Sequence, residues 1–261
     1  HAFPSPKFQI VTGIDQVSEF PVIAKAISGG YDGRGQVRLH EPAQAAGAWD
    51  ALGGRTCLVE KMVSIDYEIS VMVARRPGGE MAVYPPSRNH HTSGILTWAV
   101  LPAVISPAMS DGAQALASRI AERLGIVGLL AVECFVTTDG ELLVNELAPR
   151  PHNSYHHSER GLATSQFEQL VRAVCDLPLG STDVHAPSAI VNLLGEVWLQ
   201  HEPPHITQAL DVPGKTLDGM PTEFADGMAA RADVLGDTPW LSRRDPIWRN
   251  SSGDLRVHMM V

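Results

Sequence analysis

The chain has 261 residues, of which 44% are apolar and 19% charged, a composition typical of a soluble globular protein with one large or two small domains. Its net charge of −9 and the lack of a lysine- or arginine-rich run argue against a nucleic-acid backbone as the main partner. No run approaches the roughly 18 apolar residues of a membrane-spanning helix, and no secretory signal is expected.

The three cysteines, Cys57, Cys134 and Cys175, lie among apolar residues and show neither a CxxC pattern nor metal-binding spacing. They are expected to be reduced core cysteines of a cytoplasmic protein.

Short strands and helices alternate along the chain. The pattern predicts strands at residues 8–11, 21–27, 57–62, 67–74, 81–84 and 188–194, with broken strand character over 89–101. It predicts helices at residues 15–20, 41–51, 110–124 and 164–175. Ser110 is expected to cap the third helix and Gly125 to stop it, while Pro178 and Gly180 end the fourth. Strands and helices that alternate with several hairpins favour the α+β class over a doubly wound parallel sheet.

Two apolar strands that each carry a glutamate form the most informative stretch. Glu133 lies in AVECFV and Glu146 in ELLVNEL, and the TTDG between them predicts a β-hairpin. Two carboxylates on neighbouring apolar strands repel each other unless a cation lies between them. Hard oxygen ligands with phosphate nearby suit Mg²⁺, so the pair predicts a magnesium site. A hairpin with two edge glutamates and a polar turn is the simpler alternative.

A loop stiffened by prolines, APRPHNS, follows the second of these strands directly. It brings Arg150, His152, Asn153 and Ser154 close to the expected metal. A cation, an imidazole and two hydrogen-bonding side chains beside a metal indicate a phosphoryl-transfer site.

A single lysine, Lys25, lies on another apolar strand, directly before the glycine loop SGGYDGRGQ. A desolvated ammonium needs a partner, and a nucleotide phosphate would supply one because glycines let backbone amides approach phosphate oxygens. By itself such a loop is a weak signal, and a lysine that reaches solvent before a turn is the alternative.

These motifs resemble those of the ATP-grasp enzymes and, more narrowly, of the N5-carboxyaminoimidazole ribonucleotide synthetase family of purine biosynthesis. The resemblance rests on AKAISGGYDGRGQ, V-E-x-F, NELAPRPHNS and TSQFEQ, in this order, and covers residues 3–195. It implies an ATP-grasp domain over residues 1–195, with a flexible lobe near 20–60 and a larger lobe near 61–195 that hold the nucleotide between them. Residues 196–261 form a C-terminal region that the resemblance does not cover.

The resemblance implies a nucleotide site. Lys25 matches a phosphate-contacting lysine, Glu60 to Val63 match a hinge that contacts adenine through backbone groups, and Glu68 matches a ribose-binding residue. His91 matches a nucleotide-site histidine, although Arg88 stands where the family usually has an acidic residue. The implied cofactor-binding residues are Lys25, Gly30, Tyr31, Asp32, Gly33, Arg34, Gly35, Gln36, Glu60, Lys61, Met62, Val63, Glu68, His91, Asn145 and Glu146.

The metal and substrate residues also follow from the resemblance. Glu133 and Glu146 match two Mg²⁺ ligands, and Arg150 and His152 match residues beside the carboxylation site. The implied substrate-binding residues are Tyr31, Asp32, Arg34, Arg150, His152, Asn153 and Ser154. The neighbouring His156 and His157 are left unassigned, because adjacent side chains of an extended chain point apart.

The implied activity is the ATP- and bicarbonate-dependent carboxylation of aminoimidazole ribonucleotide to N5-carboxyaminoimidazole ribonucleotide, through carboxyphosphate. ATP and Mg²⁺ are the implied cofactors. The resemblance further implies a cytoplasmic homodimer that acts on small molecules, without nucleic-acid or membrane partners.

The chain departs from that family at both ends. It starts at His1 without a counterpart of the family's N-terminal nucleotide-fold domain, and it ends where a basic, phosphate-gripping segment is expected to begin. Two alternatives therefore stay open. One is another ATP-grasp ligase, such as the formate-dependent glycinamide ribonucleotide transformylase, and the other is an inactive ATP-binding remnant.

Overall fold

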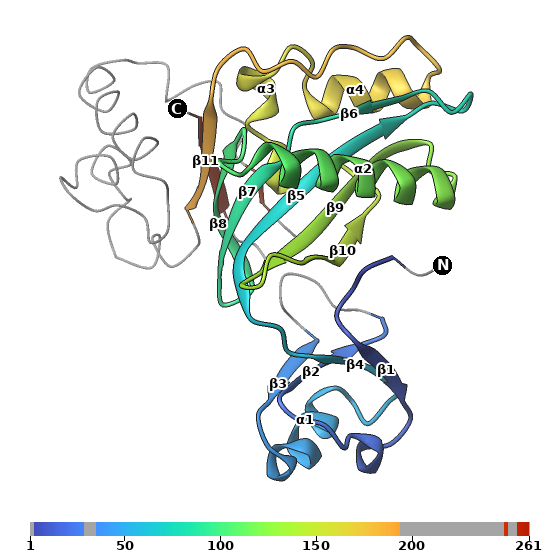
Figure 1. The fold of residues 1–261 in the computed structure, drawn as a ribbon, viewed down its shortest axis with the longest axis vertical. Helices are drawn as coiled ribbons and strands as arrows, with labels where there is room; N and C mark the ends of the chain where they lie inside the picture. Colours follow the sequence, from blue (N-terminus) through green and yellow to red (C-terminus); the bar gives the residue numbers. More distant parts are fainter. Residues whose placement is uncertain (1–2, 29–34, 194–247, 250–254, 261) are drawn as a thin grey trace, which may run out of the picture. The chain divides into compact units, whose positions relative to one another are not determined.

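The computed structural model describes residues 3–28, 35–193, 248–249 and 255–260 (Figure 1). The chain divides into two compact units that are each discontinuous in sequence. Unit 1 comprises His1–Glu68, Thr92–Ile95 and Glu133–Glu146, and unit 2 comprises Ile69–His91, Leu96–Val132 and Leu147–Val261. Two features that the sequence singled out, the loop residues 30–34 and most of region 196–261, lie outside the described residues.

Strands outnumber helices in the described chain. The strands are β1 (Phe8–Val11), β2 (Val22–Ala26), β3 (Gln36–Leu39), β4 (Cys57–Lys61), β5 (Ile65–Arg75), β6 (Met81–Val83), β7 (Ser87–Thr92), β8 (Ile95–Leu101), β9 (Gly128–Thr137), β10 (Leu142–Ala148), β11 (Ser188–Leu193), β12 (Trp248–Arg249) and β13 (Leu255–Met260). The helices are α1 (Ala45–Ala51), α2 (Pro107–Leu124), α3 (Ser158–Gly161) and α4 (Gln166–Val174), with 3₁₀ turns η1 (Ile14–Gln16), η2 (Pro42–Gln44) and η3 (Asn153–Tyr155).

A four-stranded sheet with the order β1-β4-β2-β3 forms the body of unit 1. Strand β2 alternates in burial: Val22 and Ala24 are buried and Lys25 is only partly so, because successive side chains of a strand point to opposite faces. Ala24 pairs with the buried Val59 of β4. Ala48 of α1 joins the same apolar cluster. Lys25 therefore lies on the face of β2 that is turned away from this core.

The larger sheet has nine strands in the order β10-β9-β5-β7-β8-β11-β13-β12, with β6 paired to β5. Strand β5 is buried continuously from Ile69 to Ala74, as expected for a strand covered on both faces. Figure 1 shows α2 running across strands of this sheet within unit 2. The apolar core of unit 2 includes Met72, Tyr84, Leu129 and Tyr155. Sheets and helices thus combine as the sequence predicted, and the α+β class is confirmed.

Helix α2 starts before the predicted start at residue 110. Its N-cap is Ser106, whose hydroxyl accepts a hydrogen bond from the Met109 amide at 3.2 Å. The prediction that Ser110 caps the helix was wrong. Pro107 is well suited to the first helical turn, so the helix begins at Pro107, three residues before Ser110. Gly125 ends the helix in the left-handed conformation with φ of 63°, as predicted.

Several other local predictions need correction. The expected helix over residues 15–20 is only the 3₁₀ turn η1, and strand β3 was not predicted. The break in the segment 89–101 is a hairpin turn at Ser93 and Gly94, both with positive φ, between β7 and β8. Cys57 and Cys134 are buried free thiols as expected, but Cys175 is exposed, because it lies just past the end of α4.

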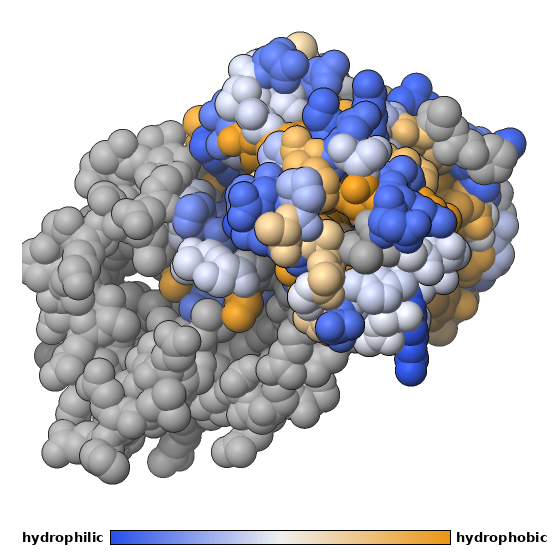
Figure 2. All heavy atoms as spheres, turned by 90° about the horizontal axis from the view of Figure 1, so that it is seen from below, coloured by the Kyte–Doolittle hydropathy of each residue, from blue (hydrophilic) through white to orange (hydrophobic). Residues whose placement is uncertain are grey.

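The described surface is mixed in character. Hydrophilic and hydrophobic residues are interspersed on the face shown in Figure 2. None of the described helices is both long and apolar enough to cross a membrane.

Candidate functional site

Lys25 is the centre of a polar cluster in unit 1. Its ammonium nitrogen lies 2.5 Å from a carboxylate oxygen of Glu60 and 3.4 Å from the amide oxygen of Asn145. All three were predicted to bind the cofactor. The pairing register explains the first contact: Lys25 lies opposite Leu58, and Glu60 is two residues further along the same face of β4. The sequence predicted that Lys25 needs a partner; in this structure the partly buried ammonium has two, a carboxylate and an amide.

The glutamate hairpin is confirmed as a local structure. Strands β9 and β10 are neighbours in the sheet, and the Thr137 amide donates to the Glu141 carbonyl at 2.9 Å. Gly140 has a φ of 85°, a conformation that glycine adopts without strain. Glu133 is half-buried and Glu146 is exposed. The turn residues that the sequence identified therefore do fix this hairpin.

The residues present fit a magnesium ion that also binds phosphate. Glu133 of β9 and Glu146 of β10 both belong to unit 1, and carboxylate oxygens are hard ligands that Mg²⁺ prefers. Asn145 adjoins Glu146 on β10, so the two side chains point to opposite faces of the strand, and Asn145 contacts Lys25 instead. Within the described part of the chain, no three His, Cys, Asp or Glu side chains gather into a metal-binding group. Two protein carboxylates with the remaining positions filled by phosphate oxygens and water is a common arrangement for this ion.

The predicted hinge follows β4. The Lys61 amide donates to the Lys7 carbonyl at 2.8 Å and the Met62 amide to the Pro21 carbonyl at 3.1 Å. These two N–H groups are engaged within unit 1, so an adenine that docks here would use carbonyls of the segment or the Val63 amide.

The glycine loop connects the antiparallel strands β2 and β3. Gly35 closes this connection: its carbonyl accepts from the Ala26 amide at 2.7 Å and its φ is 77°. Gln36 begins β3, opposite Lys25. The remaining predicted loop residues, Gly30, Tyr31, Asp32, Gly33 and Arg34, lie outside the described residues.

Two further predicted nucleotide residues lie on strands of the large sheet. Glu68 is half-buried on β5 and His91 is half-buried on β7. The preceding His90 stacks on Trp98, with ring centroids 5.1 Å apart. Because neighbouring side chains of a strand alternate in direction, this stacking places His91 on the opposite face of β7.

The loop RPHNS turns into the 3₁₀ turn η3, and His152 caps it. The His152 amide donates to the side-chain oxygen of Gln166 at 2.7 Å, and the Gln166 side-chain nitrogen donates back to the His152 carbonyl at 3.0 Å. Gln166 is fully buried. This reciprocal pair fixes the backbone of the predicted catalytic histidine to the first turn of α4.

The four predicted residues of this loop differ in exposure. Arg150 is exposed, and its guanidinium donates to the Pro151 carbonyl at 3.0 Å. Ser154 is fully buried, and its hydroxyl oxygen lies 2.8 Å from Nδ1 of His152. Both amide atoms of the Asn153 side chain are buried without a hydrogen-bond partner among the described residues. Since a buried amide without a partner is costly, Asn153 is the residue here that most needs a ligand.

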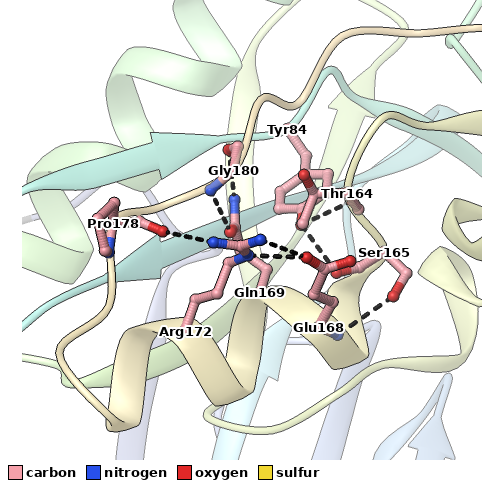
Figure 3. A network of polar contacts seen from close by, with 8 residues as sticks. All are labelled: Tyr84, Thr164, Ser165, Glu168, Gln169, Arg172, Pro178 and Gly180. Atoms are coloured by element: carbon pink, nitrogen blue, oxygen red, sulfur yellow. Dashed lines mark hydrogen bonds and ion pairs between the residues drawn. The ribbon is translucent and has the colours of Figure 1, made fainter.

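Helix α4 is itself anchored by reciprocal polar contacts, which Figure 3 shows. Gln169 accepts from the Gly180 amide and donates to the Gly180 carbonyl, both at 2.8 Å. The Tyr84 hydroxyl lies 3.2 Å from the Thr164 carbonyl. Burial, and secondarily the negative charge of Glu168, raise the pKa of Tyr84 above its ordinary value. These contacts hold the helix that positions Gln166.

Sequence reasoning missed several residues that build the loop. Gln166 lies in the motif TSQFEQ, which could have marked it, but no role was predicted for it. Ser70 of β5 carried no such signal, because a serine within a strand is common and does not indicate a functional site. His157 is fully buried, and burial lowers its pKa to about 3. Its Nε2 lies 3.2 Å from the Ser87 hydroxyl, so His157 is a neutral core residue.

A model of the ATP-grasp domain matches residues 1–167, which is more than half of the chain. The chain belongs to the ATP-grasp family. Among curated relatives of this ATP-grasp chain, N5-carboxyaminoimidazole ribonucleotide synthase of Bacillus subtilis is 47% identical over 192 residues, covering 73% of this chain and 50% of that protein. The chain spans about half the length of the curated relatives it matches.

Solved structures agree with this assignment. The crystal structure of N5-carboxyaminoimidazole ribonucleotide synthetase from Thermus thermophilus is 36% identical with a TM-score of 0.71, covering 91% of this chain and 69% of that one. An ADP complex of an N5-carboxyaminoimidazole ribonucleotide synthetase is 35% identical with a TM-score of 0.74, covering 89% of this chain and 67% of that one. The ATP-grasp fold predicted from the motifs is thereby confirmed.

Proposed function

We propose that this chain carries the ATP-grasp part of an enzyme that carboxylates aminoimidazole ribonucleotide with ATP and bicarbonate. Bicarbonate attacks the γ-phosphate of ATP, and carboxyphosphate and ADP form. The exocyclic amine of aminoimidazole ribonucleotide then captures the carboxyl group, which releases phosphate and gives N5-carboxyaminoimidazole ribonucleotide. The similarity to synthetases of this name supports the proposal.

The observation that carries the proposal is the RPHNS loop, whose backbone is held by Gln166 and whose Asn153 amide has no hydrogen-bond partner among the residues that the structure describes. A scaffold that fixes a histidine backbone twice and leaves a buried amide without a partner is prepared for a polar ligand. In the proposal Asn153 binds the ribonucleotide and Arg150 holds the carboxyphosphate anion. Ser154 as a substrate contact stays a prediction, since its hydroxyl is fully buried and bonded to His152.

The nucleotide half of the proposal rests on Lys25. When ATP binds, its phosphates would compete with Glu60 and Asn145 for the ammonium, which sits 2.5 Å and 3.4 Å from these partners. A phosphate oxygen carries more charge than the Asn145 amide oxygen, so exchange with Asn145 is favourable for Lys25, whereas Glu60 is already a charged partner and keeps its ion pair. The ADP complex of a related synthetase supports nucleotide binding by this fold.

Glu133 and Glu146 would hold Mg²⁺, which when bound neutralises charge on the phosphate oxygens. The exposure of Glu146 suits this role, because a ligand must be reachable by the metal–nucleotide complex. The proposed roles of Tyr31, Asp32 and Arg34 in ribonucleotide binding, and of Glu68 and His91 in nucleotide binding, follow from the family motifs.

The assembly and location are further proposals from the same family. We propose a homodimer in the cytoplasm, with an ATP-grasp domain over residues 1–195 and a separate C-terminal region over 196–261. The three free thiols, Cys57, Cys134 and Cys175, support a reducing compartment.

The test is phosphate release from ATP by this chain with Mg²⁺ and bicarbonate, with and without aminoimidazole ribonucleotide. Release that depends on both the ribonucleotide and bicarbonate supports the proposal. Release that depends on formate and glycinamide ribonucleotide would favour the transformylase instead. Magnesium-dependent ATP binding without any release would identify this chain as a nucleotide-binding module without turnover, and would overturn the proposed reaction.

A further inference from the structure

A row of buried polar groups leads from the large sheet to the ring of His152, and all its members belong to unit 2. The Ser154 hydroxyl oxygen lies 2.8 Å from Nδ1 of His152 and 2.7 Å from the hydroxyl oxygen of Ser70 on β5. The Ser70 hydroxyl lies 3.5 Å from the side-chain oxygen of Asn89 on β7. Ser70 and Ser154 are fully buried and Asn89 is 3% exposed, so water does not take part freely.

Each hydroxyl has one proton and can accept two hydrogen bonds. Ser70 and Ser154 are fully buried, and an arrangement in which one of them accepts from both neighbours leaves its own buried O–H without an acceptor in the row, which is costly. Two arrangements, of opposite direction, use every hydroxyl proton within the row. In the first direction Asn89 donates to Ser70, Ser70 to Ser154, and Ser154 to Nδ1 of His152, which leaves the ring proton on Nε2. In the second direction the ring proton is on Nδ1 and donates to Ser154, Ser154 donates to Ser70, and Ser70 donates to Asn89.

The backbone at the N-cap favours the first direction. The Ser154 amide points its proton at Nδ1 of His152 with a separation of 3.4 Å. This contact needs a lone pair on Nδ1, whereas a proton on Nδ1 would face the amide proton. The second direction therefore sets two donors against each other in a buried site.

Asn89 favours the first direction as well. With its oxygen toward Ser70, its side-chain nitrogen Nδ2 is buried and has no hydrogen-bond partner among the described residues. A half-turn of the amide exchanges oxygen and nitrogen at almost no change in shape. The NH₂ group then donates to Ser70 and the carbonyl takes the unpaired place. A buried carbonyl lacking a partner is tolerated better than a buried N–H lacking one.

We infer that Asn89, Ser70 and Ser154 form a relay that donates to Nδ1 of His152, so that the ring carries its proton on Nε2. The tautomer itself does not depend on the proposed function, but its role in the reaction, described next, does. With Nδ1 occupied by the relay, His152 presents a hydrogen-bond donor to the carboxyphosphate anion and offers no lone pair to the amine of the ribonucleotide. His152 is then the group that stabilises the anion, and the amine proton goes elsewhere. Ser70 and Asn89 are positioning residues that act through Ser154.

The tautomer can be read directly by nitrogen NMR of the chain with ¹⁵N-labelled histidine, without substrates, because protonated and unprotonated ring nitrogens resonate far apart. The His152 signals are those lost in His152→Gln. The native chain is expected to show the Nε2-protonated form. Asn89→Asp places an acceptor where the relay needs a donor, and should raise the share of the Nδ1-protonated form relative to the Nε2-protonated form about fivefold, the worth of one hydrogen bond.

Matched variants separate the relay from general damage. Asn192→Asp buries a carboxylate in the same sheet, at a residue that is 4% exposed and whose amide donates to Leu96, and should leave the His152 tautomer unchanged. If Asn89→Asp does not fold, Ser70→Ala tests the same relay without burying a charge and should shift the ratio in the same direction. Ser188→Ala, at another buried serine, is its control.

The possible outcomes are distinct. An Nδ1-protonated His152 in the native chain, or an unchanged ratio in every relay variant that folds, overturns the inference whatever the enzymatic activity. The Nε2-protonated form in the native chain, together with the expected change of tautomer ratio in the variants, establishes the relay. This holds even if the chain releases no phosphate, a result that would contradict only the proposed reaction.

Discussion

Gln166→Ala is expected to release the RPHNS loop from helix α4. The wild-type side chain makes two hydrogen bonds to the His152 backbone, at 2.7 and 3.0 Å, and is fully buried. Each bond contributes about 1 kcal/mol net, and each backbone group left buried without a partner adds a penalty of about 1 kcal/mol or more. The free energy of unfolding should therefore fall by about 2–4 kcal/mol.

Gln169→Ala provides a matched control on the same helix. Gln169 is also fully buried and makes an equivalent reciprocal pair with the Gly180 backbone, both bonds being 2.8 Å long. Its stability loss should therefore be similar. The two variants should differ only in what they release: the His152 segment in one and the segment at Gly180 in the other.

Urea unfolding measures the stability losses, and amide hydrogen exchange locates them. The His152 amide should exchange faster in Gln166→Ala and at the wild-type rate in Gln169→Ala. Phosphate release should fall further in Gln166→Ala than in its control, because only this change loosens the proposed catalytic residue. A stability loss below about 1 kcal/mol, or unchanged exchange at His152, would refute the reasoning.

Three further predictions follow from the site and the core. Glu146→Gln should abolish magnesium-dependent ADP binding, measured by calorimetry, whereas the exposed Glu141→Gln should keep it; unimpaired binding in Glu146→Gln would remove this residue from the metal site. Burial lowers the pKa of His157 to about 3. Below about pH 6.5 this histidine is therefore protonated in the unfolded chain but stays neutral in the folded chain. The free energy of unfolding falls on this account by up to about 1.4 kcal/mol per pH unit between about pH 6.5 and 3. Urea titrations at pH 7 and 5 should show a smaller decrease for His157→Gln than for the native chain, and equal decreases would contradict the assignment. Burial, with the charge of Glu133, raises the pKa of Cys134 to about 12, so an alkylating reagent at pH 8 should label Cys175 first by mass spectrometry, and early labelling of Cys134 would show that β9 opens readily.

Local signals allowed several elements to be predicted. The Asp-Gly turn with β-formers on both sides identified the β9–β10 hairpin, and Gly125 identified the end of α2, because both depend on backbone conformations that few residues adopt. Cap residues were less certain: Ser106 and Ser110 are both good N-caps, and only the continuation of the helix through Pro107 separates them.

Contacts between distant residues could not be predicted in the same way. The sequence indicated that Lys25 needs a partner, but the partner in this structure depends on the register of β2 with β4, which sets Glu60 beside it. Gln166 belongs to the motif TSQFEQ, but its two hydrogen bonds to the His152 backbone depend on how α4 packs against the RPHNS loop. Ser70 and Asn89 gave no signal, since their relay joins two strands and a loop that are far apart in the chain.

The sequence by itself determined the family, the α+β class and the chemical types at the candidate site, because ordered motifs of glycines, glutamates and the RPHNS loop constrain the local backbone and supply the functional groups. Only the tertiary structure decided which of these groups are buried, which are already paired, and which side of His152 carries its proton. Burial and hydrogen-bond direction depend on which groups the fold places around each side chain. At His152 these groups come from strands β5 and β7, the RPHNS loop and helix α4, so no single segment of the sequence determines them.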